Sequence, residues 1–258
     1  MTSRDNSFNK IILGIDIGGT GIKSSPVDTD KGELLNEPLY LKTPNPSTPS
    51  AVLDVISVVI ENWQWKGDLG CGFPGVIRHG EVFLAANVSK EWLGVNIVKE
   101  LEGIAPAKIG VMNDADCAGL AEMKFGAGKP YCHDHGGIVM LLTLGTGIGS
   151  ALFLDGKLLK NTEFGHIEMD GVDAEKRAAT VIMERENLSW EEWGGRVNKY
   201  LNMMEMLFSP DVFIIGGGVS ESSEKFFKYL NVRAEIRPAK LHNEAGIVGA
   251  ALSVETDV

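Results

Sequence analysis

The spacing of apolar residues in the first quarter of the chain predicts a hairpin followed by a helix. Ile11–Ile17 is a continuous apolar run, and Ile22–Val27 follows it after a glycine-rich turn, which is typical of a β-hairpin. Further on, Thr48 and Pro49 are suited to the N-cap and the first position of a helix. Apolar residues then recur at helical spacing as far as Trp63.

The same order of elements returns in the second half of the chain. Gly137–Leu144 is expected to be a buried strand that turns at Gly145–Gly149 into a second strand, Ser150–Leu154, before a helix over Ala174–Glu186. The repeat at 11–63 and 137–186 predicts a duplicated α/β architecture with a cleft where the two halves face each other. We expect a small N-terminal domain over 1–112 and a larger C-terminal domain over 113–258.

Further elements complete each half. A capping box, Ser189-x-x-Glu192, predicts the start of a long helix that ends at Phe208. The last helix, predicted over Ala245–Val254, carries glycine and alanine on one face and is therefore suited to close packing. Strands are also expected at 69–77 (with a break at Pro74-Gly75), 108–112 and 211–215, and helices at 95–101, at 115–125 and from Ser220.

Composition and charge restrict the classes of function. A formal net charge of −11 argues against a nucleic-acid surface, which needs concentrated Lys and Arg, although a local basic groove is compatible with it. The 3 cysteines are scattered and predict reduced thiols. The polar start of the chain has no signal-peptide pattern, and no apolar run reaches the roughly 20 residues that span a membrane. We therefore expect a cytoplasmic protein.

Two glycine-rich turns carry candidate phosphate chemistry. Glycine lets backbone N–H groups approach phosphate oxygens, and threonine adds a hydroxyl donor. One such turn is more often an ordinary hairpin turn, but two such turns at equivalent places in the two halves are unlikely to arise by chance. Asp16, at the end of the first strand, is placed to hold Mg²⁺ through water. Gly217 belongs to a third glycine cluster, which is either a floor for the donor or a tight turn. The candidate phosphate-binding residues are Asp16, Gly18, Gly19, Thr20, Lys23, Gly145, Thr146, Gly147 and Gly217.

Phosphoryl transfer to an alcohol also needs a carboxylate that accepts the hydroxyl proton. Asn113 and Asp114 stand at a strand end just before a helix, which is where α/β sheets place ligands. Asp114 is our candidate base, and a helix-capping role is its structural alternative. A sugar needs amides and bidentate acceptors, so Asn87, Glu163 and His166 join Asn113 as candidate sugar ligands.

The ordered set of these motifs resembles the ROK-type bacterial sugar kinases, in particular their polyphosphate-dependent branch. The motifs are D-I-G-G-T-G-I-K, C-G-F-P-G-V, A-N-V-S-K-E-W, N-D-A-D, L-T-L-G-T-G-I-G and N-T-E-F-G-H-I-E, and the resemblance runs from Ile11 to Leu252. It implies a two-domain fold of the hexokinase–actin (ribonuclease H-like) type, a homodimer, and transfer of a phosphoryl group from inorganic polyphosphate or ATP to the 6-hydroxyl of glucose with Mg²⁺. It also implies that Asp114 is the base.

One departure from the family pattern concerns zinc. Common members of the family carry C-x-C-G-x-x-G-C-x-E shortly after the G-H pair, whereas this chain reads I-E-M-D-G-V-D-A-E-K-R-A-A. Structural zinc is therefore not expected. Glu175 is suited to replace the glutamate that closes that motif, and it is the fifth candidate sugar ligand. The polyphosphate branch is similar in lacking these cysteines.

Three alternatives remain open at this stage. The chain is compatible with an ATP-only glucokinase, a kinase that also accepts mannose, or a non-catalytic sugar-binding protein. Donor preference rests on the resemblance and on basic residues that the sequence does not place in one groove: Lys23, Arg177, Arg233, Arg237 and Lys240.

Overall fold

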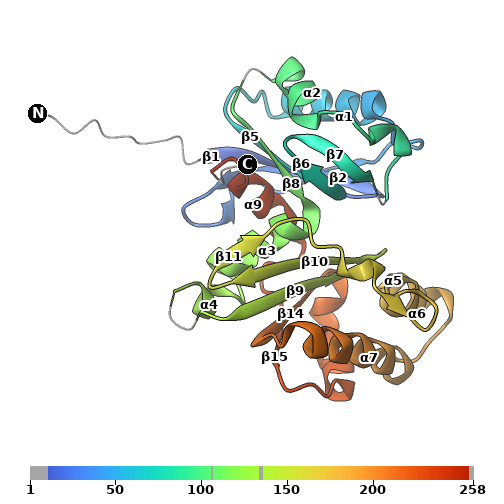
Figure 1. The fold of residues 1–258 in the computed structure, drawn as a ribbon. Helices are drawn as coiled ribbons and strands as arrows, with labels where there is room; N and C mark the ends of the chain where they lie inside the picture. Colours follow the sequence, from blue (N-terminus) through green and yellow to red (C-terminus); the bar gives the residue numbers. More distant parts are fainter. Residues whose placement is uncertain (1–10, 86, 106, 134–135, 256–258) are drawn as a thin grey trace, which may run out of the picture. The chain divides into compact units, whose positions relative to one another are not determined.

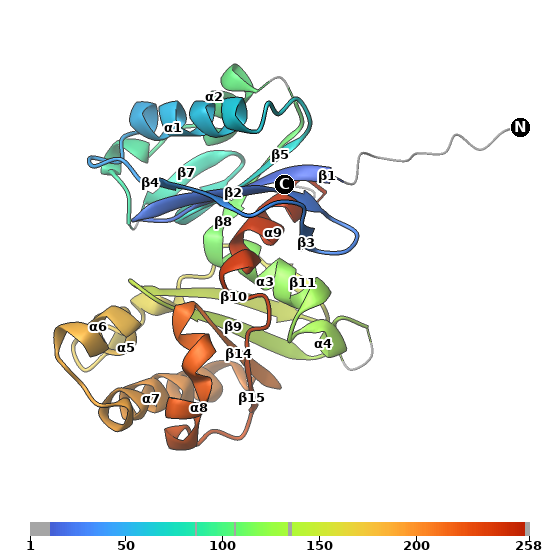
Figure 2. The same ribbon diagram turned by 180° about the vertical axis from the view of Figure 1, so that it is seen from behind.

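The computed structural model describes residues 11–85, 87–105, 107–133 and 136–255. The chain forms two compact units. The first contains the residues up to Cys117 together with the segment from Gly246 onward, and the second contains Ala118–Ala245. The predicted division at residue 112 places the last helix with the second half, whereas in the structure this helix belongs to the first unit (Figures 1 and 2). No helix among the described residues is long and apolar enough to cross a membrane.

The first unit is built on a mixed sheet in the order β3-β2-β1-β5-β8, with β4 also paired to β2. The predicted hairpin is confirmed: β1 and β2 are antiparallel. Strands β5 and β8 run parallel to β1. The strands are β1 (Ile11–Ile17), β2 (Gly21–Asp28), β3 (Glu33–Leu34), β4 (Leu39–Lys42), β5 (Leu69–Phe73) and β8 (Ile109–Asn113), with a separate hairpin of β6 (Gly75–Arg78) and β7 (Glu81–Ala85).

Helices cover both faces of this sheet. On one face lie α1 (Pro49–Asn62) and α2 (Ile97–Ile104), whose buried residues Val52, Ile56 and Ile97 join the apolar core (Figure 2). Helix α1 begins as predicted, since the Thr48 side chain accepts the Ala51 N–H and Pro49 occupies the first turn. A short 3-10 helix, η1 (Lys90–Trp92), lies after β7.

The other face carries α9 (Ala245–Leu252), and three glycines make room for it. Gly14, Gly70 and Gly110 are register neighbours on β1, β5 and β8, so they form a row across the sheet. A Cβ added at Gly70 would lie 1.8 Å from the Ala250 carbonyl oxygen, and one at Gly14 would lie 2.1 Å from that of Ile247. The helix backbone therefore packs directly on the sheet backbone, which any larger residue in this row would prevent.

The second unit repeats the plan of the first. Its sheet runs β11-β10-β9-β14-β15, with an antiparallel hairpin of β9 and β10 and with β14 parallel to β9. This similarity is the duplication that the sequence predicted. The strands are β9 (Ile138–Leu144), β10 (Ile148–Leu154), β11 (Lys157–Leu159), β14 (Val212–Gly216) and β15 (Glu235–Pro238), and a small hairpin joins β12 (Glu168–Met169) to β13 (Val172–Asp173).

Helix α7 (Trp190–Phe208) provides much of the second core. Its capping box between Ser189 and Glu192 is present as predicted, and Trp193 and Met204 are buried. Met206 on the same helix is 77% exposed. The other helices are α3 (Asp114–Phe125), α4 (Lys129–His133), η2 (Phe164–His166), α5 (Glu175–Ala178), α6 (Thr180–Arg185), η3 (Gly218–Ser222), α8 (Ser223–Phe226), η4 (Phe227–Tyr229) and η5 (His242–Glu244).

Two helix predictions in this unit were wrong. The helix expected over Ala174–Glu186 is two short helices, α5 and α6, because Ala179 between them is extended, with a ψ of 151°. The buried indole N–H of Trp193 bonds to the carbonyls of Ala178 and Ala179 at this break, at 3.1 and 3.3 Å. The helix expected from Ser220 is likewise a series of short turns, which bring the buried Phe226 ring against Trp193.

Candidate active site

The first glycine turn joins β1 to β2. The Gly18 N–H donates to the Gly21 carbonyl at 2.9 Å, which closes the turn, and Gly19 and Thr20 are exposed. A Cβ at Gly19 would lie 3.3 Å from Asn87, so the candidate sugar ligand Asn87 lies against the candidate phosphate turn. The structure therefore brings these two predicted residues together.

Asp16 lies at the end of β1 beneath this turn. Burial raises the pKa of its carboxyl group, and the positive charge of Lys23, its register partner on β2, lowers it in part. Glycines surround the carboxylate, because a Cβ at Gly246 would lie 2.6 Å from Oδ2 and one at Gly72 would lie 3.7 Å from Oδ1. No described residue donates a hydrogen bond to this side chain. A partly buried carboxylate in such a setting favours a cation next to it.

Asn113 and Asp114 follow the neighbouring strand β8. Asn113 is 4% exposed, and its amide oxygen accepts the N–H groups of Ala115 and Asp116 at 2.9 and 3.0 Å. The capping role that sequence reasoning considered for Asp114 thus belongs to Asn113. The Asn113 amide nitrogen also donates to the Gly75 carbonyl at 3.2 Å. The Asp114 carboxylate accepts the Ala115 N–H at 2.8 Å.

Sequence reasoning missed Gly72, which lies between these two carboxylate positions. It pairs with Asp16 on one side and with Met112 on the other. A Cβ there would lie 3.7 Å from both the Asp16 Oδ1 atom and the Asp114 Cα atom. Asp16 and the start of α3 therefore both lie beside Gly72 at the end of the central strand. Its signal was the short pattern C-G-F-P-G, which supplies glycine at the end of the central strand.

The second glycine turn, in the other unit, has a similar construction. The Gly145 N–H donates to the Gly147 carbonyl at 3.0 Å, and Thr146 at its tip is exposed. Gly217 packs against the end of β9, the strand that leads into this turn. Its φ is +83°, and a Cβ there would lie 2.4 Å from the Leu144 carbonyl oxygen. Gly217 is thus required for close packing and for its positive φ. The Glu175 carboxylate accepts the N–H of Ile148 at 3.4 Å, just after this turn.

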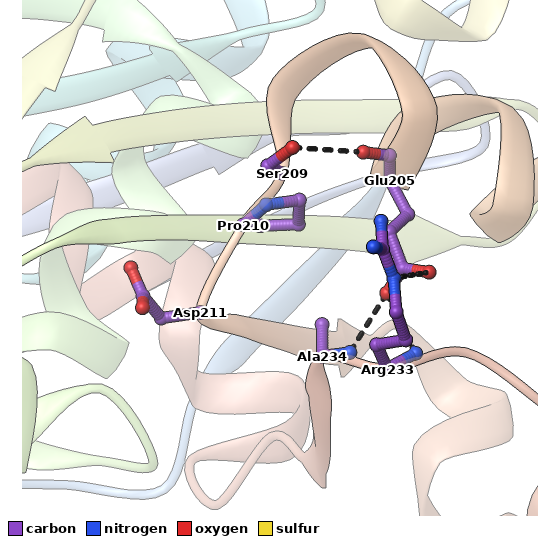
Figure 3. A pocket seen from close by; sticks show the side chains of 6 residues that line it. All are labelled: Glu205, Ser209, Pro210, Asp211, Arg233 and Ala234. Atoms are coloured by element: carbon purple, nitrogen blue, oxygen red, sulfur yellow. Dashed lines mark hydrogen bonds and ion pairs between the residues drawn. The ribbon is translucent and has the colours of Figure 1, made fainter.

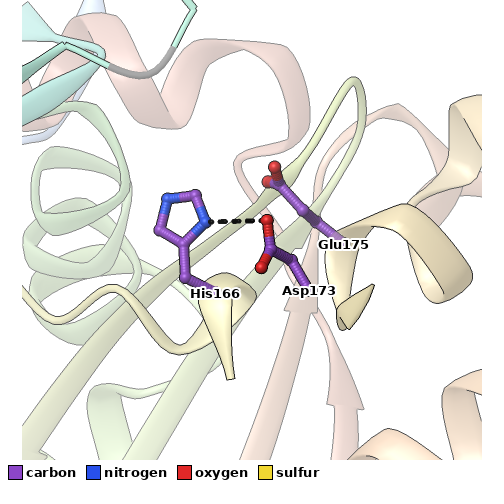
Figure 4. A group of neighbouring side chains, drawn as sticks. All are labelled: His166, Asp173 and Glu175. Carbon is purple, nitrogen blue, oxygen red and sulfur yellow. Dashed lines mark ion pairs between the residues drawn. The ribbon is translucent and has the colours of Figure 1, made fainter. Parts of the chain in front are cut away.

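His166, Asp173 and Glu175 lie together beside the second turn (Figure 4), and Glu163 and Lys176 adjoin them. His166 Nε2 lies 3.6 Å from a Glu163 oxygen, and His166 Nδ1 lies 3.9 Å from an Asp173 oxygen. Lys176 Nζ lies 2.8 Å from that Asp173 oxygen. Burial, with a smaller contribution from Glu175, raises the pKa of the Glu163 carboxyl, whereas His166 lowers it. Three of the five sugar-ligand candidates are therefore neighbours within one unit.

The cluster also has metal-ligating chemistry. Ligand atoms of His166, Asp173 and Glu175 all lie within 4.8 Å of one another. Asp173, however, already has a cationic partner in Lys176 and is about one third exposed. Asp173 and Lys176 therefore form an ion pair in the segment that follows His166.

The basic residues considered for donor binding are mostly engaged elsewhere. Arg233 pairs with Glu205 at 3.2 Å on the wall of a pocket of about 310 Å³ (Figure 3). Arg237 pairs with Glu235 at 2.7 Å. Lys23 is the one of the set that the structure places next to a predicted phosphate-binding residue, Asp16.

Comparison with known proteins places this geometry in a family. A sequence model described as the ROK family matches residues 12–186. The chain is 46% identical over 249 residues to a polyphosphate glucokinase of Mycobacterium tuberculosis, covering 95% of this chain and 91% of that protein. It is 28% identical to a glucokinase of Streptomyces coelicolor, covering 93% and 96%.

Solved structures agree with the sequence comparison. An inorganic polyphosphate/ATP-glucomannokinase from Arthrobacter sp. strain KM superposes with a TM-score of 0.90 at 45% identity, covering 96% of this chain and 99% of that one. A ROK family glucokinase from Streptomyces griseus, solved with glucose and AMPPNP, superposes at 0.79 with 24% identity, covering 93% and 98%. The expected two-domain, hexokinase-like α/β fold is confirmed, and the chain belongs to the ROK family.

Proposed function

We propose that this chain is a polyphosphate glucokinase, which transfers a phosphoryl group from inorganic polyphosphate, and also from ATP, to the 6-hydroxyl of glucose. Identities of 45 and 46% over nearly the whole length of two polyphosphate-using kinases support the donor class. The observation that carries the chemistry is the meeting of Asp16 and the start of α3 over Gly72. A phosphoryl-transfer enzyme needs a cation site and a base close together.

Asp114 acts as the base in this proposal. Its carboxylate stands at the N-terminus of a helix, whose dipole favours the charged form before catalysis begins. It orients the 6-hydroxyl and accepts its proton as the oxygen attacks the terminal phosphorus, while the bond to the bridging oxygen of the donor breaks. Asn113, already fixed by three hydrogen bonds, offers its remaining amide proton to a sugar oxygen.

The other site residues divide between sugar and donor. Asn87, Glu163, His166 and Glu175 bind sugar hydroxyls, and the two glycine turns with Gly217 receive phosphate oxygens. Asp16 fits Mg²⁺, because its carboxylate has no hydrogen-bond donor among the described residues and burial disfavours its charged form without a cation. When bound, Mg²⁺ neutralises charge on the phosphates. Lys23 contributes a second positive charge beside Asp16.

A donor panel tests the proposal directly. We expect glucose 6-phosphate from glucose with long-chain polyphosphate in the absence of nucleotide, and also with ATP, each in the presence of Mg²⁺. Mannose belongs in the panel, since the Arthrobacter relative is a glucomannokinase. Product from ATP but none from polyphosphate would overturn the polyphosphate assignment. Glucose binding without product from any donor would favour a sugar-binding protein that is not an enzyme.

The raised pKa of Glu163 predicts how glucose binding depends on pH. A carboxylate accepts sugar hydroxyls only when it is deprotonated, so KM for glucose should rise as the pH falls through the pKa of Glu163. Because burial raises that pKa, the rise should begin at a higher pH than an ordinary glutamate would give. Glu163→Gln should remove this dependence, and Glu168→Gln, an exposed neighbour, should retain it. An unchanged profile in Glu163→Gln would exclude Glu163 as the titrating ligand.

The assembly and location of the protein stay predictions. We propose a cytoplasmic homodimer, as the family resemblance implies. Helix α7 exposes two apolar side chains, Met206 and Leu207, which are suited to a protein contact. Sedimentation equilibrium of the purified chain would measure the oligomeric state, and a monomer at micromolar concentration would exclude the dimer.

A further inference from the structure

Both glycine turns are held from outside by a threonine that sequence reasoning did not single out. In the first unit, the Thr43 hydroxyl donates to the Gly18 carbonyl at 2.6 Å, and the Thr43 N–H donates to the Thr20 carbonyl at 3.3 Å. In the second unit, the Thr180 hydroxyl donates to the Leu144 carbonyl at 3.1 Å. The next N–H, that of Val181, donates to the Gly145 carbonyl at 3.1 Å.

The two arrangements have the same chemistry although different elements supply them. Thr43 follows strand β4, which pairs with β2 beside the turn, whereas Thr180 is the first residue of helix α6. In each case one hydroxyl and one backbone N–H bond to two carbonyl oxygens at the turn. Tyr40 adds to the first arrangement, since its hydroxyl also donates to the Thr20 carbonyl, at 3.3 Å.

These bonds fix the direction of the N–H groups in the turns. A peptide group is planar and trans, so its carbonyl and its N–H point in opposite directions. Holding the Gly18 carbonyl therefore orients the Gly19 N–H, and holding the Gly145 carbonyl orients the Thr146 N–H. No described residue accepts a hydrogen bond from either of these N–H groups. Both are thus oriented in advance and remain available to a ligand.

We propose that Thr43 and Thr180 are positioning residues for the phosphoryl donor. Thr43 orients the Gly19 N–H toward the donor by holding the Gly18 carbonyl. Thr180 holds the Leu144 carbonyl, which orients the Gly145 N–H that closes the second turn, and it stands next to the Val181 N–H that holds the Gly145 carbonyl. Such pre-orientation of backbone dipoles lowers the cost of binding a charged group. The inference rests on the proposed function, because it assumes that the two turns receive the donor.

Variants that remove only the hydroxyl test the proposal. Thr43→Val and Thr180→Val keep the side-chain shape and lose the hydrogen bond. Each should raise KM for long-chain polyphosphate about tenfold, the size of effect that one lost hydrogen bond produces, and leave KM for glucose unchanged. Thr43→Ser and Thr180→Ser, which retain a hydroxyl, should restore KM for polyphosphate. A role in folding alone would instead lower the melting temperature without separating the two KM values.

Two controls separate this proposal from the proposed function. Thr29→Val removes a buried hydroxyl that donates to the Glu255 carboxylate, and it should leave both KM values unchanged. Gly145→Ala adds a methyl group at the turn itself, where the new Cβ would meet no protein atom within 4 Å and would therefore obstruct only a bound ligand. If Gly145→Ala raises KM for polyphosphate but neither valine variant does, the positioning role is wrong and the phosphate turn stands. If none of the three raises it, the role of the turns in donor binding is wrong as well.

Discussion

Replacing Asp114 with asparagine should reduce kcat by at least about 10³-fold, within the range that general-base catalysis contributes. Asparagine has nearly the same shape and retains an oxygen that accepts the Ala115 N–H, so helix α3 should still begin at the same place. The asparagine side chain does not accept a proton, so the attacking hydroxyl of glucose would keep its proton. Steady-state kinetics with glucose and polyphosphate would measure the effect.

The matched control for this change is Asp54→Asn. Asp54 is exposed on helix α1, so the same substitution should leave kcat unchanged. The dissociation constant of glucose from Asp114→Asn, measured by calorimetry, should stay close to the wild-type value, because the base acts mainly on the transition state. Turnover at the wild-type rate in Asp114→Asn would show that the base lies elsewhere in the chain.

Replacing Gly70 with alanine should destabilise the first unit by about 3 kcal/mol or more, as overpacking of a tightly filled core does. The added Cβ would lie 1.8 Å from the Ala250 carbonyl oxygen, and both partners are backbone, so neither can move as a flexible side chain would. Helix α9 would have to leave the glycine row of β1, β5 and β8. Urea unfolding followed by circular dichroism would measure the loss.

A second alanine variant serves as the control for Gly70→Ala. Gly103 is an exposed glycine in helix α2, and a Cβ there would meet no atom within 4 Å. Gly103→Ala should stabilise the unit by up to about 1 kcal/mol, because alanine favours the helix. Equal unfolding midpoints for Gly70→Ala and wild type would contradict the close packing of α9 on the sheet.

The chemistry of the site could be read from the sequence where it depends on residues close together in the chain. The D-I-G-G-T and L-G-T-G-I-G turns and the Asn113-Asp114 pair are local patterns of strand, turn and helix start, so their residue types indicate phosphate and proton chemistry before any fold is known. The same holds for the Thr48 and Ser189 helix starts, whose hydrogen bonds span three residues.

Helix lengths after residue 174 could not be predicted in this way. The apolar spacing of Ala174–Glu186 fits one helix. In the structure, the indole N–H of Trp193 on α7 donates to the carbonyls of Ala178 and Ala179 at the break. A hydrogen bond from 14 or 15 residues along the chain leaves no periodic signal. The small residues of the last helix did predict close packing, yet they carried no information about the surface on which it packs.

The sequence by itself determined the repeated hairpin-and-helix plan, the two phosphate turns and the candidate base, since each depends on neighbours within a few positions. Only the tertiary structure decided that the last helix returns to the first unit, that Asp16 and the start of α3 both lie beside Gly72, and that Thr43 and Thr180 hold the turns. These contacts join residues 25 to more than 200 positions apart. Strand order, register and the packing of helices α6 and α9 bring them together, and no local pattern encodes these.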